Sequence, residues 1–188
     1  MLGEKLGHVF DKPLEGVARN ISVHPNTITI TGFLITTLAS FILVTHMRAG
    51  GILILAGGLF DVLDGVVARI NNKRTRFGAF LDSVLDRYSD AFILLGLGWN
   101  LFNRADFQGV FLCLVTLVGA FLISYARARA EGLGERCNFG LLERPERIIL
   151  ISFATISGYI MPVLWLMAVL THVTVIQRIY TARKVMSR

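Results

Sequence analysis

Long apolar runs alternate along the chain with short polar segments that are rich in Lys and Arg. The apolar residues form continuous runs rather than one stripe of an amphipathic helix, which is typical of helices surrounded by lipid or protein. A helix needs about 20 apolar residues to cross the hydrocarbon core of a bilayer. The pattern therefore predicts six membrane-spanning helices, at about residues 27–47, 51–71, 79–101, 109–129, 147–162 and 163–183. Gly158, Tyr159 and Pro162 predict a tight turn between the last two spans.

The first 22 residues have a different pattern, in which apolar positions recur at helical spacing between basic residues. These apolar positions are Leu2, Leu6, Val9, Phe10, Leu14 and Val17. An amphipathic helix on the membrane surface, broken at Pro13, fits this pattern, and a frayed tail is the alternative. We therefore predict an all-α integral membrane protein with a single domain over residues 1–188, made of a juxtamembrane helix at 1–22 and a six-helix bundle at 23–183.

The net charge of +6 is explained by the membrane rather than by a nucleic acid, because no soluble segment carries a basic stripe interleaved with aromatic residues. Of the 19 Lys and Arg residues, all but Arg48, Arg87 and Arg104 fall near the termini or the loops after the second and fourth spans. The positive-inside rule makes that side cytoplasmic, so we predict a multi-pass cell-membrane protein with both termini in the cytoplasm. Neither Cys113 nor Cys137 has metal-ligand spacing, and we expect two free thiols.

Five aspartates lie within the second and third predicted spans: Asp61, Asp64, Asp82, Asp86 and Asp90. An aspartate at the centre of a membrane helix costs about 2.5–3.5 kcal/mol of insertion free energy, so such residues indicate a functional site. Pairing with nearby arginines or a position near the water interface is the alternative. One or two ion pairs cannot neutralise five carboxylates, which favours the functional interpretation.

The spacing of these aspartates predicts a divalent metal site. Asp61 and Asp64 lie about 60° apart around one helix, and Asp82 and Asp86 lie about 40° apart around the next. Two antiparallel helices joined by a short loop turn these faces together, and the four carboxylates then repel one another unless cations lie between them. Hard oxygen ligands suit Mg²⁺ or Mn²⁺ rather than Zn²⁺, and protein-bound Mg²⁺ commonly completes its shell with water and substrate phosphate.

Small residues accompany the aspartates on the same two helices. Gly65 and Ala68 lie near the face of the first pair, and Gly78 and Ala79 begin the third span. They leave room for a ligand beside the backbone, or they allow tight helix packing, which small residues also serve in membranes. Arg69 follows one turn later, where a guanidinium can contact phosphate oxygens.

Together these residues resemble the signature of the CDP-alcohol phosphotransferase family, the class I CDP-alcohol phosphatidyltransferases. The matching stretch is Asp61-x2-Asp64-Gly65-x2-Ala68-Arg69-x8-Gly78-x3-Asp82-x3-Asp86. The resemblance implies that Asp61, Asp64, Asp82 and Asp86 bind two Mg²⁺ ions, for which Mn²⁺ can substitute, and that Asp86 is also the general base. It implies CDP-lipid binding by His24, Pro25, Asn26, Thr27, Gly65, Ala68, Arg69, Thr75, Gly78 and Ala79. Asp90 falls outside the signature, and we interpret it as a supporting or structural residue.

The acceptor is suggested by arginines near the cytoplasmic ends of the last three spans. Their sequence context resembles that of the phosphatidylinositol phosphate and archaetidylinositol phosphate synthases. In that branch the positions of Arg127, Arg129, Arg147 and Arg178 bind the phosphate of the acceptor. The resemblance thus implies transfer from CDP-diacylglycerol or CDP-archaeol to inositol phosphate, with an active site on the cytoplasmic side of a homodimer.

Three other functions remain open from the sequence. A phosphatidylglycerophosphate synthase, which uses glycerol 3-phosphate, also needs an anion pocket. A membrane prenyltransferase also pairs aspartate motifs with Mg²⁺, but its motifs lack the Gly65, Ala68 and Arg69 pattern. A cation transporter with intramembrane carboxylates is the alternative that is not an enzyme.

Overall fold

The computed structural model describes Gly16, residues 23–135 and residues 140–187, and the elements in the two long ranges are all α-helices. They are α3 (Pro25–Leu43), α4 (Met47–Ile70), α5 (Arg76–Asn103), α6 (Phe107–Gly132), α7 (Arg144–Ser157) and α8 (Ile160–Met186). No strand occurs in these ranges, so the all-α prediction is confirmed for them. The surface helix predicted over residues 1–22 lies outside the described residues, apart from Gly16.

Four of the described helices, α3, α4, α6 and α8, are long and apolar enough to cross a membrane. The fifth candidate, α5, has 28 residues, but its stretch 82–90 carries the charged groups Asp82, Asp86, Arg87 and Asp90. The sixth, α7, has 14 residues and therefore a length of about 21 Å, which is shorter than the hydrocarbon core of about 30 Å. The crossing of the membrane by α5 and α7 thus stays a prediction.

Local sequence explains where several of these helices begin and end. Pro25 occupies the first turn of α3, a position that needs no backbone N–H. The Thr75 hydroxyl caps α5 by accepting a hydrogen bond from the Gly78 N–H at 2.9 Å. Gly158 ends α7 with a φ of 87°, the left-handed conformation that glycine adopts without steric cost. The turn predicted around Gly158, Tyr159 and Pro162 is confirmed, because α8 begins at Ile160.

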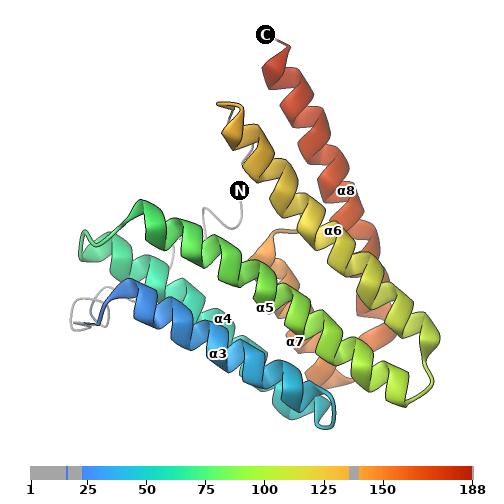
Figure 1. Ribbon diagram of the computed structural model, residues 1–188. Helices are drawn as coiled ribbons and strands as arrows, with labels where there is room; N and C mark the ends of the chain where they lie inside the picture. The colour runs from blue at the N-terminus through green and yellow to red at the C-terminus, as the bar shows by residue number, and fades with distance from the viewer. Residues whose placement is uncertain (1–15, 17–22, 136–139, 188) are drawn as a thin grey trace.

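Contacts between neighbouring helices join the six described helices into a ring. α3 packs against α4 and α5, α5 against α6, α6 against α8, α8 against α7, and α7 against α4. Figure 1 shows α3, α4 and α5 side by side, with α6 and α8 running together at an angle to them. The two groups meet where α5 leads into α6, and they diverge toward the start of α5 and the end of α6. The helices of the ring are therefore packed together at one end, the closed end, and spread apart at the other, the open end.

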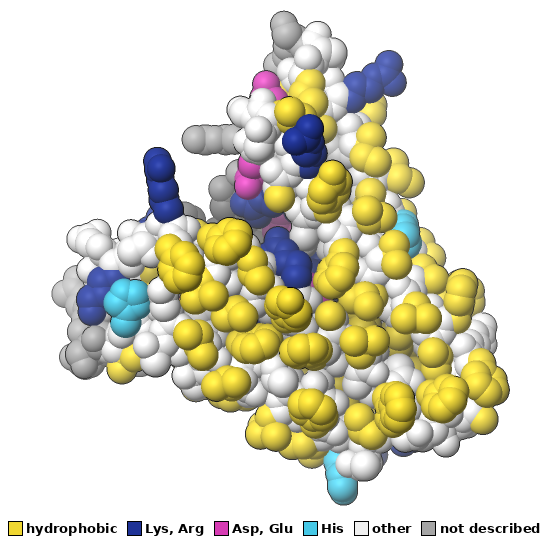
Figure 2. Space-filling view, viewed as in Figure 1, with side chains coloured by type: hydrophobic (Ala, Val, Ile, Leu, Met, Phe, Trp, Pro, Cys, Tyr) yellow, Lys and Arg dark blue, Asp and Glu magenta, His cyan; other side chains and the backbone are white. Residues whose placement is uncertain are grey.

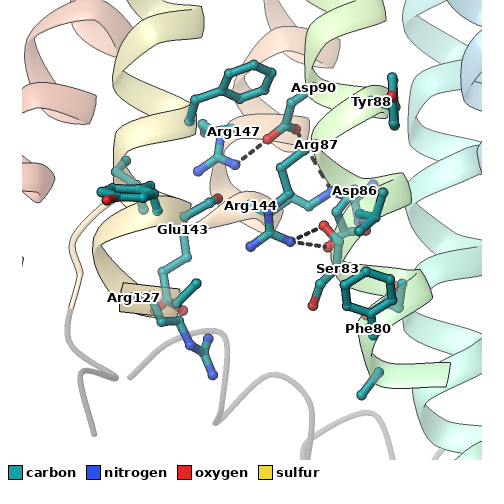
Figure 3. Close-up of a pocket in the computed structure, with 18 of the residues that line it drawn as sticks. Phe80, Ser83, Asp86, Arg87, Tyr88, Asp90, Arg127, Glu143, Arg144 and Arg147 are labelled. Carbon is teal, nitrogen blue, oxygen red and sulfur yellow. Dashed lines mark hydrogen bonds and ion pairs between the residues drawn. The ribbon is translucent and has the colours of Figure 1, made fainter. Parts of the chain in front are cut away.

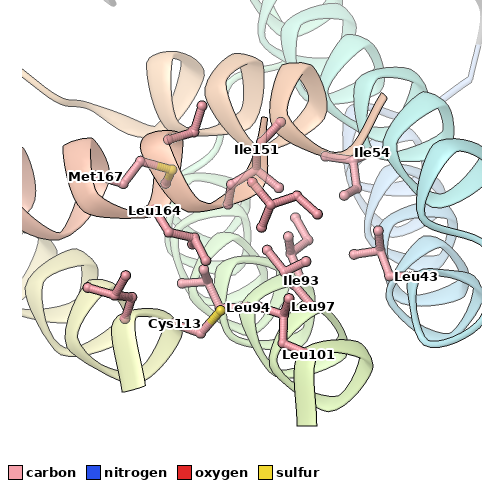
Figure 4. Packing of buried hydrophobic residues seen from close by; sticks show 14 of the residues in the cluster. Leu43, Ile54, Ile93, Leu94, Leu97, Leu101, Cys113, Ile151, Leu164 and Met167 are labelled. Carbon is pink, nitrogen blue, oxygen red and sulfur yellow. The ribbon is translucent and has the colours of Figure 1, made fainter. Parts of the chain in front are cut away.

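The closed end of the ring holds the main apolar core. Buried side chains from all six described helices contribute to it, and Figure 4 shows how they pack. They include Leu43, Ile54, Leu97, Leu101, Cys113, Ile151, Leu164 and Met167. Close backbone approach supports this packing, since a Cβ at Gly96 would collide with the Ser40 carbonyl oxygen. Buried Asn100 adds a polar link, because its amide donates to the carbonyls of Leu43 and Val44 at 3.0 and 2.8 Å.

Candidate active site between two diverging groups of helices

A cavity of about 1090 Å³ occupies the open end of the ring. Its lining comes mainly from the first half of α5, the last third of α6 and the start of α7, with Arg178 from α8 and Arg69 from α4. In the space-filling view, charged side chains gather in the hollow between the two groups of helices, α3 to α5 and α6 with α8. Hydrophobic side chains cover much of the face below (Figure 2). The aromatic side chains of Phe80, Tyr88 and Tyr125 are exposed and also line the cavity. The hollow thus combines a charged interior with apolar walls.

Five aspartates from α4 and α5 are brought together at this end. Asp61 and Asp64 lie on α4, and Asp82, Asp86 and Asp90 lie on successive turns of α5. Asp64 is buried, and its Oδ2 atom has no hydrogen-bond partner among the described residues. The prediction that the two helices turn these acidic faces together is confirmed, because one arginine side chain contacts both helices at once.

That arginine is Arg144, the first residue of α7. Its Nη1 atom lies 2.6 Å from Asp61 Oδ2. The same atom lies 2.7 Å from Asp86 Oδ1, and the Nε atom lies 3.9 Å from Asp90 Oδ1; Figure 3 labels Arg144, Asp86 and Asp90. A single guanidinium therefore joins α4, α5 and α7. The sequence alone does not indicate a role for Arg144, since no spacing rule relates a residue on α7 to an aspartate 83 positions earlier.

Asp90 and Arg147 form a second charged pair, deeper in the structure. Arg147 Nη2 donates to Asp90 Oδ2 at 2.5 Å, and Arg147 Nη1 donates to the Leu142 carbonyl at 3.3 Å. The two side chains are only 4% and 6% exposed, so their charges need nearby opposite charges, which for Asp90 include Arg144 Nε at 3.9 Å. Asp90, which the signature does not include, thus has a definite partner next to the predicted metal residues.

The other arginines predicted to bind the acceptor differ in their surroundings. Arg178 is buried, donates to the Ile123 carbonyl at 2.6 Å and lies 3.5 Å from Glu143. Arg127 is exposed and donates to Glu131 at 2.8 Å. Arg127, Arg147 and Arg178 all line the cavity, whereas Arg129, also exposed, is not part of the lining. The structure therefore brings three of the four predicted arginines together.

The residues predicted to bind the nucleotide lie at the start of α3 and α5. The His24 Nδ1 atom accepts a hydrogen bond from the Asn26 N–H at 3.3 Å, just before Pro25 and Thr27. A Cβ at Gly78 would lie 2.8 Å from Asn26 Oδ1, so the missing side chain lets the two helix starts approach closely. Thr75 is the cap that begins α5. These residues lie together but outside the cavity lining.

The small residues of α4 and their arginine form a third group. A Cβ at Gly65 would lie 3.3 Å from Arg69 Nη1, so the guanidinium folds back over the glycine one turn earlier. Ala68, next to Arg69, is partly buried. Arg69 and Ala79 line the cavity, whereas Gly65 and Ala68 do not. The predicted residues of the second and third spans therefore lie at or beside the open end.

The profile of the CDP-alcohol phosphatidyltransferase family matches residues 22–181, which is most of the chain. The chain belongs to this family. It is therefore a phosphatidyltransferase and an enzyme, as the signature predicted, and the family together with the four apolar helices makes it a multi-pass membrane protein.

Relatives of this phosphatidyltransferase include enzymes that carry names for specific reactions. It is 39% identical over 178 residues to the archaetidylinositol phosphate synthase of Pyrococcus horikoshii, covering 92% of both chains. The crystal structure of Mycobacterium tuberculosis phosphatidylinositol phosphate synthase with CDP-DAG bound matches with a TM-score of 0.77 and 33% identity, over 95% of this chain and 94% of that one. The same mycobacterial enzyme in complex with manganese and citrate matches with a TM-score of 0.78 and 33% identity, over 94% and 88% of the two chains.

The family is metal-dependent, and the aspartates of this phosphatidyltransferase fit a divalent ion in donor chemistry. They offer carboxylate oxygens from two adjacent helices, including a buried Asp64 oxygen without a hydrogen-bond partner among the described residues. Residues 23–135 and 140–187 contain no preformed group of three His, Cys, Asp or Glu side chains in metal-binding geometry. Between Asp61 and Asp86 the contacting group is the Arg144 guanidinium.

Proposed function

We propose that this phosphatidyltransferase transfers the phosphatidyl or archaetidyl group of a CDP-lipid to inositol 1-phosphate, also named 1D-myo-inositol 3-phosphate, and releases CMP. The observation that supports this function best is one cavity lined both by aspartates of α5 and by arginines of α6, α7 and α8. The carboxylates suit a metal-bound diphosphate, and the arginines suit an acceptor that carries its own phosphate. The names of the relatives from Pyrococcus and Mycobacterium, both inositol phosphate lipid synthases, support the same acceptor.

Asp61, Asp64, Asp82 and Asp86 are the residues that would hold two Mg²⁺ ions, or Mn²⁺ in their place. When bound, the ions supply positive charge that neutralises the diphosphate and its leaving group. Asp86 accepts the proton of the attacking acceptor hydroxyl, since it lines the cavity beside the arginines. The chain itself thus provides the base and the walls that orient both substrates.

Different parts of the chain bind the two substrates. The CDP-lipid is held by the start of α3, at His24, Pro25, Asn26 and Thr27, and by Gly65, Ala68, Arg69, Thr75, Gly78 and Ala79 around the α4–α5 turn. Arg127, Arg147 and Arg178 bind the phosphate of the acceptor at the cavity, and Arg129 contributes from the exposed end of α6. Charge-assisted hydrogen bonds from guanidinium groups are well suited to a phosphomonoester.

We further propose that α5 and α7 also cross the membrane, which makes six spans within one domain over residues 1–188. α7 enters from the side of the cavity and ends at Gly158 near the opposite face, where α8 begins its return. The open end of the ring, both termini and the juxtamembrane helix then lie on the cytoplasmic side, in agreement with the distribution of Lys and Arg. The enzyme acts as a homodimer, an expectation that rests on the family resemblance.

A parallel assay of four acceptors tests this function. With Mg²⁺ and a CDP-lipid, we expect kcat/KM for inositol 1-phosphate to exceed that for free inositol or serine by at least roughly tenfold, because an uncharged acceptor leaves the arginines without their anion. CMP release measured by mass spectrometry gives the rates. Preference for free inositol or serine would contradict the anion pocket. Preference for glycerol 3-phosphate would retain the pocket and identify a phosphatidylglycerophosphate synthase instead.

A second measurement tests binding of the proposed donor separately from turnover. CDP-lipid should raise the thermal stability of the enzyme in the presence of Mg²⁺, since a ligand that binds only the folded state stabilises it. Turnover and nucleotide-dependent stability are therefore measured on the same protein preparation.

A further inference from the structure

Arg144, the first residue of α7, pairs with aspartates on two other helices. One nitrogen atom, Nη1, contacts carboxylates on two different helices, Asp61 at 2.6 Å and Asp86 at 2.7 Å. The side chain is 17% exposed, so it lies mostly inside the protein while still lining the cavity. Asp61 and Asp86 are two of the four residues proposed to hold divalent ions. The guanidinium therefore occupies the position between carboxylates that a cation would take.

We propose that Arg144 is the internal counter-ion of the aspartate cluster and competes with the divalent ions for it. Without metal, the guanidinium neutralises Asp61 and Asp86; when divalent ions bind these carboxylates, it is released into the cavity, where it faces the anionic substrate. This inference rests on the proposed function, because it takes Asp61 and Asp86 to be metal ligands. It assigns to Arg144 a positioning role that links the metal site to substrate binding.

Comparison with Arg147, three residues further on, supports a movable role for Arg144. Arg147 is 4% exposed and donates both to Asp90 and to the Leu142 carbonyl, so backbone and side-chain contacts hold it in place. Among the described residues, the Arg144 side chain pairs only with carboxylates, those of Asp61, Asp86 and, more distantly, Asp90. Asp61 and Asp86 are groups that a divalent ion would take, and the adjacent cavity offers space for the released side chain.

Charge favours replacement of the Arg144 guanidinium by a divalent ion, and it couples metal binding to substrate binding. Neighbouring carboxylates such as Asp61 and Asp86 repel one another, and a single guanidinium offsets one unit of charge where a divalent ion offsets two. While Arg144 is docked, the cluster is not available to metal, and the apparent affinity for metal falls in proportion to the available fraction. Coupling between binding sites is reciprocal. An anionic substrate that attracts Arg144 into the cavity therefore strengthens metal binding, and metal strengthens substrate binding.

Direct measurement of Mn²⁺ binding tests this competition without any turnover. The purified full-length protein in detergent is stripped of metal and titrated with Mn²⁺, and free Mn²⁺ is followed by electron paramagnetic resonance. If Arg144 is docked about nine-tenths of the time, Arg144→Gln should bind Mn²⁺ roughly tenfold more tightly than the unmodified protein. Arg127→Gln is the matched control, since it removes the same charge from the same cavity while its partner is Glu131. It should change the affinity by less than about twofold, as expected for an exposed charge that solvent and salt screen.

The possible outcomes distinguish the counter-ion role of Arg144 from the proposed metal site. Equal or weaker Mn²⁺ binding by Arg144→Gln would overturn the counter-ion role while leaving the metal site itself intact. Absence of Mn²⁺ binding by the unmodified protein would contradict the proposed metal site, and this inference with it. A comparable gain in affinity in Arg127→Gln would mean that overall cavity charge, and not the docked guanidinium, controls metal binding.

A second measurement uses the unmodified protein and does not depend on the folding of a variant. Phenylglyoxal modifies accessible arginines, and mass spectrometry of the peptides assigns the modified positions. We expect saturating Mn²⁺ to increase modification of Arg144 several-fold. Arg147 should stay protected with and without Mn²⁺, and Arg127 should react in both states, because it is 46% exposed. Reactivity of Arg144 that does not change with Mn²⁺ would overturn the proposal.

Discussion

Replacing Asp86 with asparagine is expected to lower turnover with inositol 1-phosphate by at least about 100-fold, the lower end of the range for a positioned general base. Asparagine has almost the same shape as aspartate but cannot accept the proton of the attacking hydroxyl. Binding of the CDP-lipid should survive to a large extent, because Asp61, Asp64 and Asp82 remain. The expected pattern is therefore a fall in kcat with retained stabilisation by CDP-lipid and Mg²⁺.

Steady-state kinetics and thermal unfolding of the same Asp86→Asn protein measure the two effects. Asp106→Asn is the matched control, since it makes the same chemical change at the opposite end of the bundle. There the Asp106 Oδ1 atom caps α6 by accepting from the Gly109 N–H at 2.9 Å, and asparagine caps equally well. Turnover of Asp86→Asn within a few-fold of normal would contradict the role of general base. Loss of CDP-lipid binding together with turnover would instead assign Asp86 to substrate binding.

Truncating Arg147 is expected to destabilise the folded protein by about 3–5 kcal/mol, the usual effect of removing one partner from a buried ion pair. The loss leaves Asp90 charged and 6% exposed, with its 2.5 Å hydrogen bond removed. Arg129→Ala removes an exposed arginine from the same predicted set and should stay within about 0.5 kcal/mol of the parent. The two variants therefore separate a structural effect from an effect on the acceptor.

A double variant tests the origin of this destabilisation. Asp90→Asn combined with Arg147→Met removes both charges, and it should recover most of the stability lost in Arg147→Ala, because no uncompensated charge remains buried. Denaturant unfolding in detergent gives the free energies. If Arg147→Ala unfolds like the parent, the Asp90 pair contributes little and Arg147 acts mainly on the acceptor. If the double variant is no more stable than Arg147→Ala, packing rather than charge is the cause.

The parts of the site that depend on local spacing could be predicted from the sequence. Asp61 and Asp64 share a face because they lie three residues apart on one helix, and Asp82 and Asp86 do so because they lie four apart. The short loop between α4 and α5 then places both faces at the same end of the bundle. Gly158 marked the end of α7 because its left-handed φ of 87° suits glycine best. All these inferences use contacts within a few residues or across one turn.

The contacts that the sequence did not indicate join residues far apart in the chain. Arg144 is 83 positions from Asp61, and Arg147 is 57 positions from Asp90. Helical periodicity gives the direction of a side chain but not which distant helix it meets, and here the meeting depends on α7 closing the ring between α4 and α8. The burial of Arg178 was hidden for the same reason, because the Ile123 carbonyl that it contacts lies on another helix. Basic residues near helix ends fit exposed anchoring and buried pairing equally well by pattern alone.

The shortness of α7 has a consequence for how the two substrates are encountered. Its 14 residues rise about 21 Å, so in the proposed six-span arrangement, with Gly158 at one face of the bilayer, Arg144 would lie about 9 Å inside the other edge of the hydrocarbon core. Water and charge would then reach into one leaflet at the open end of the ring. The proposed CDP-lipid would arrive there by lateral diffusion, at a two-dimensional concentration set by its mole fraction. The proposed acceptor would bind from solution at its bulk concentration, so the two substrates would come from different phases.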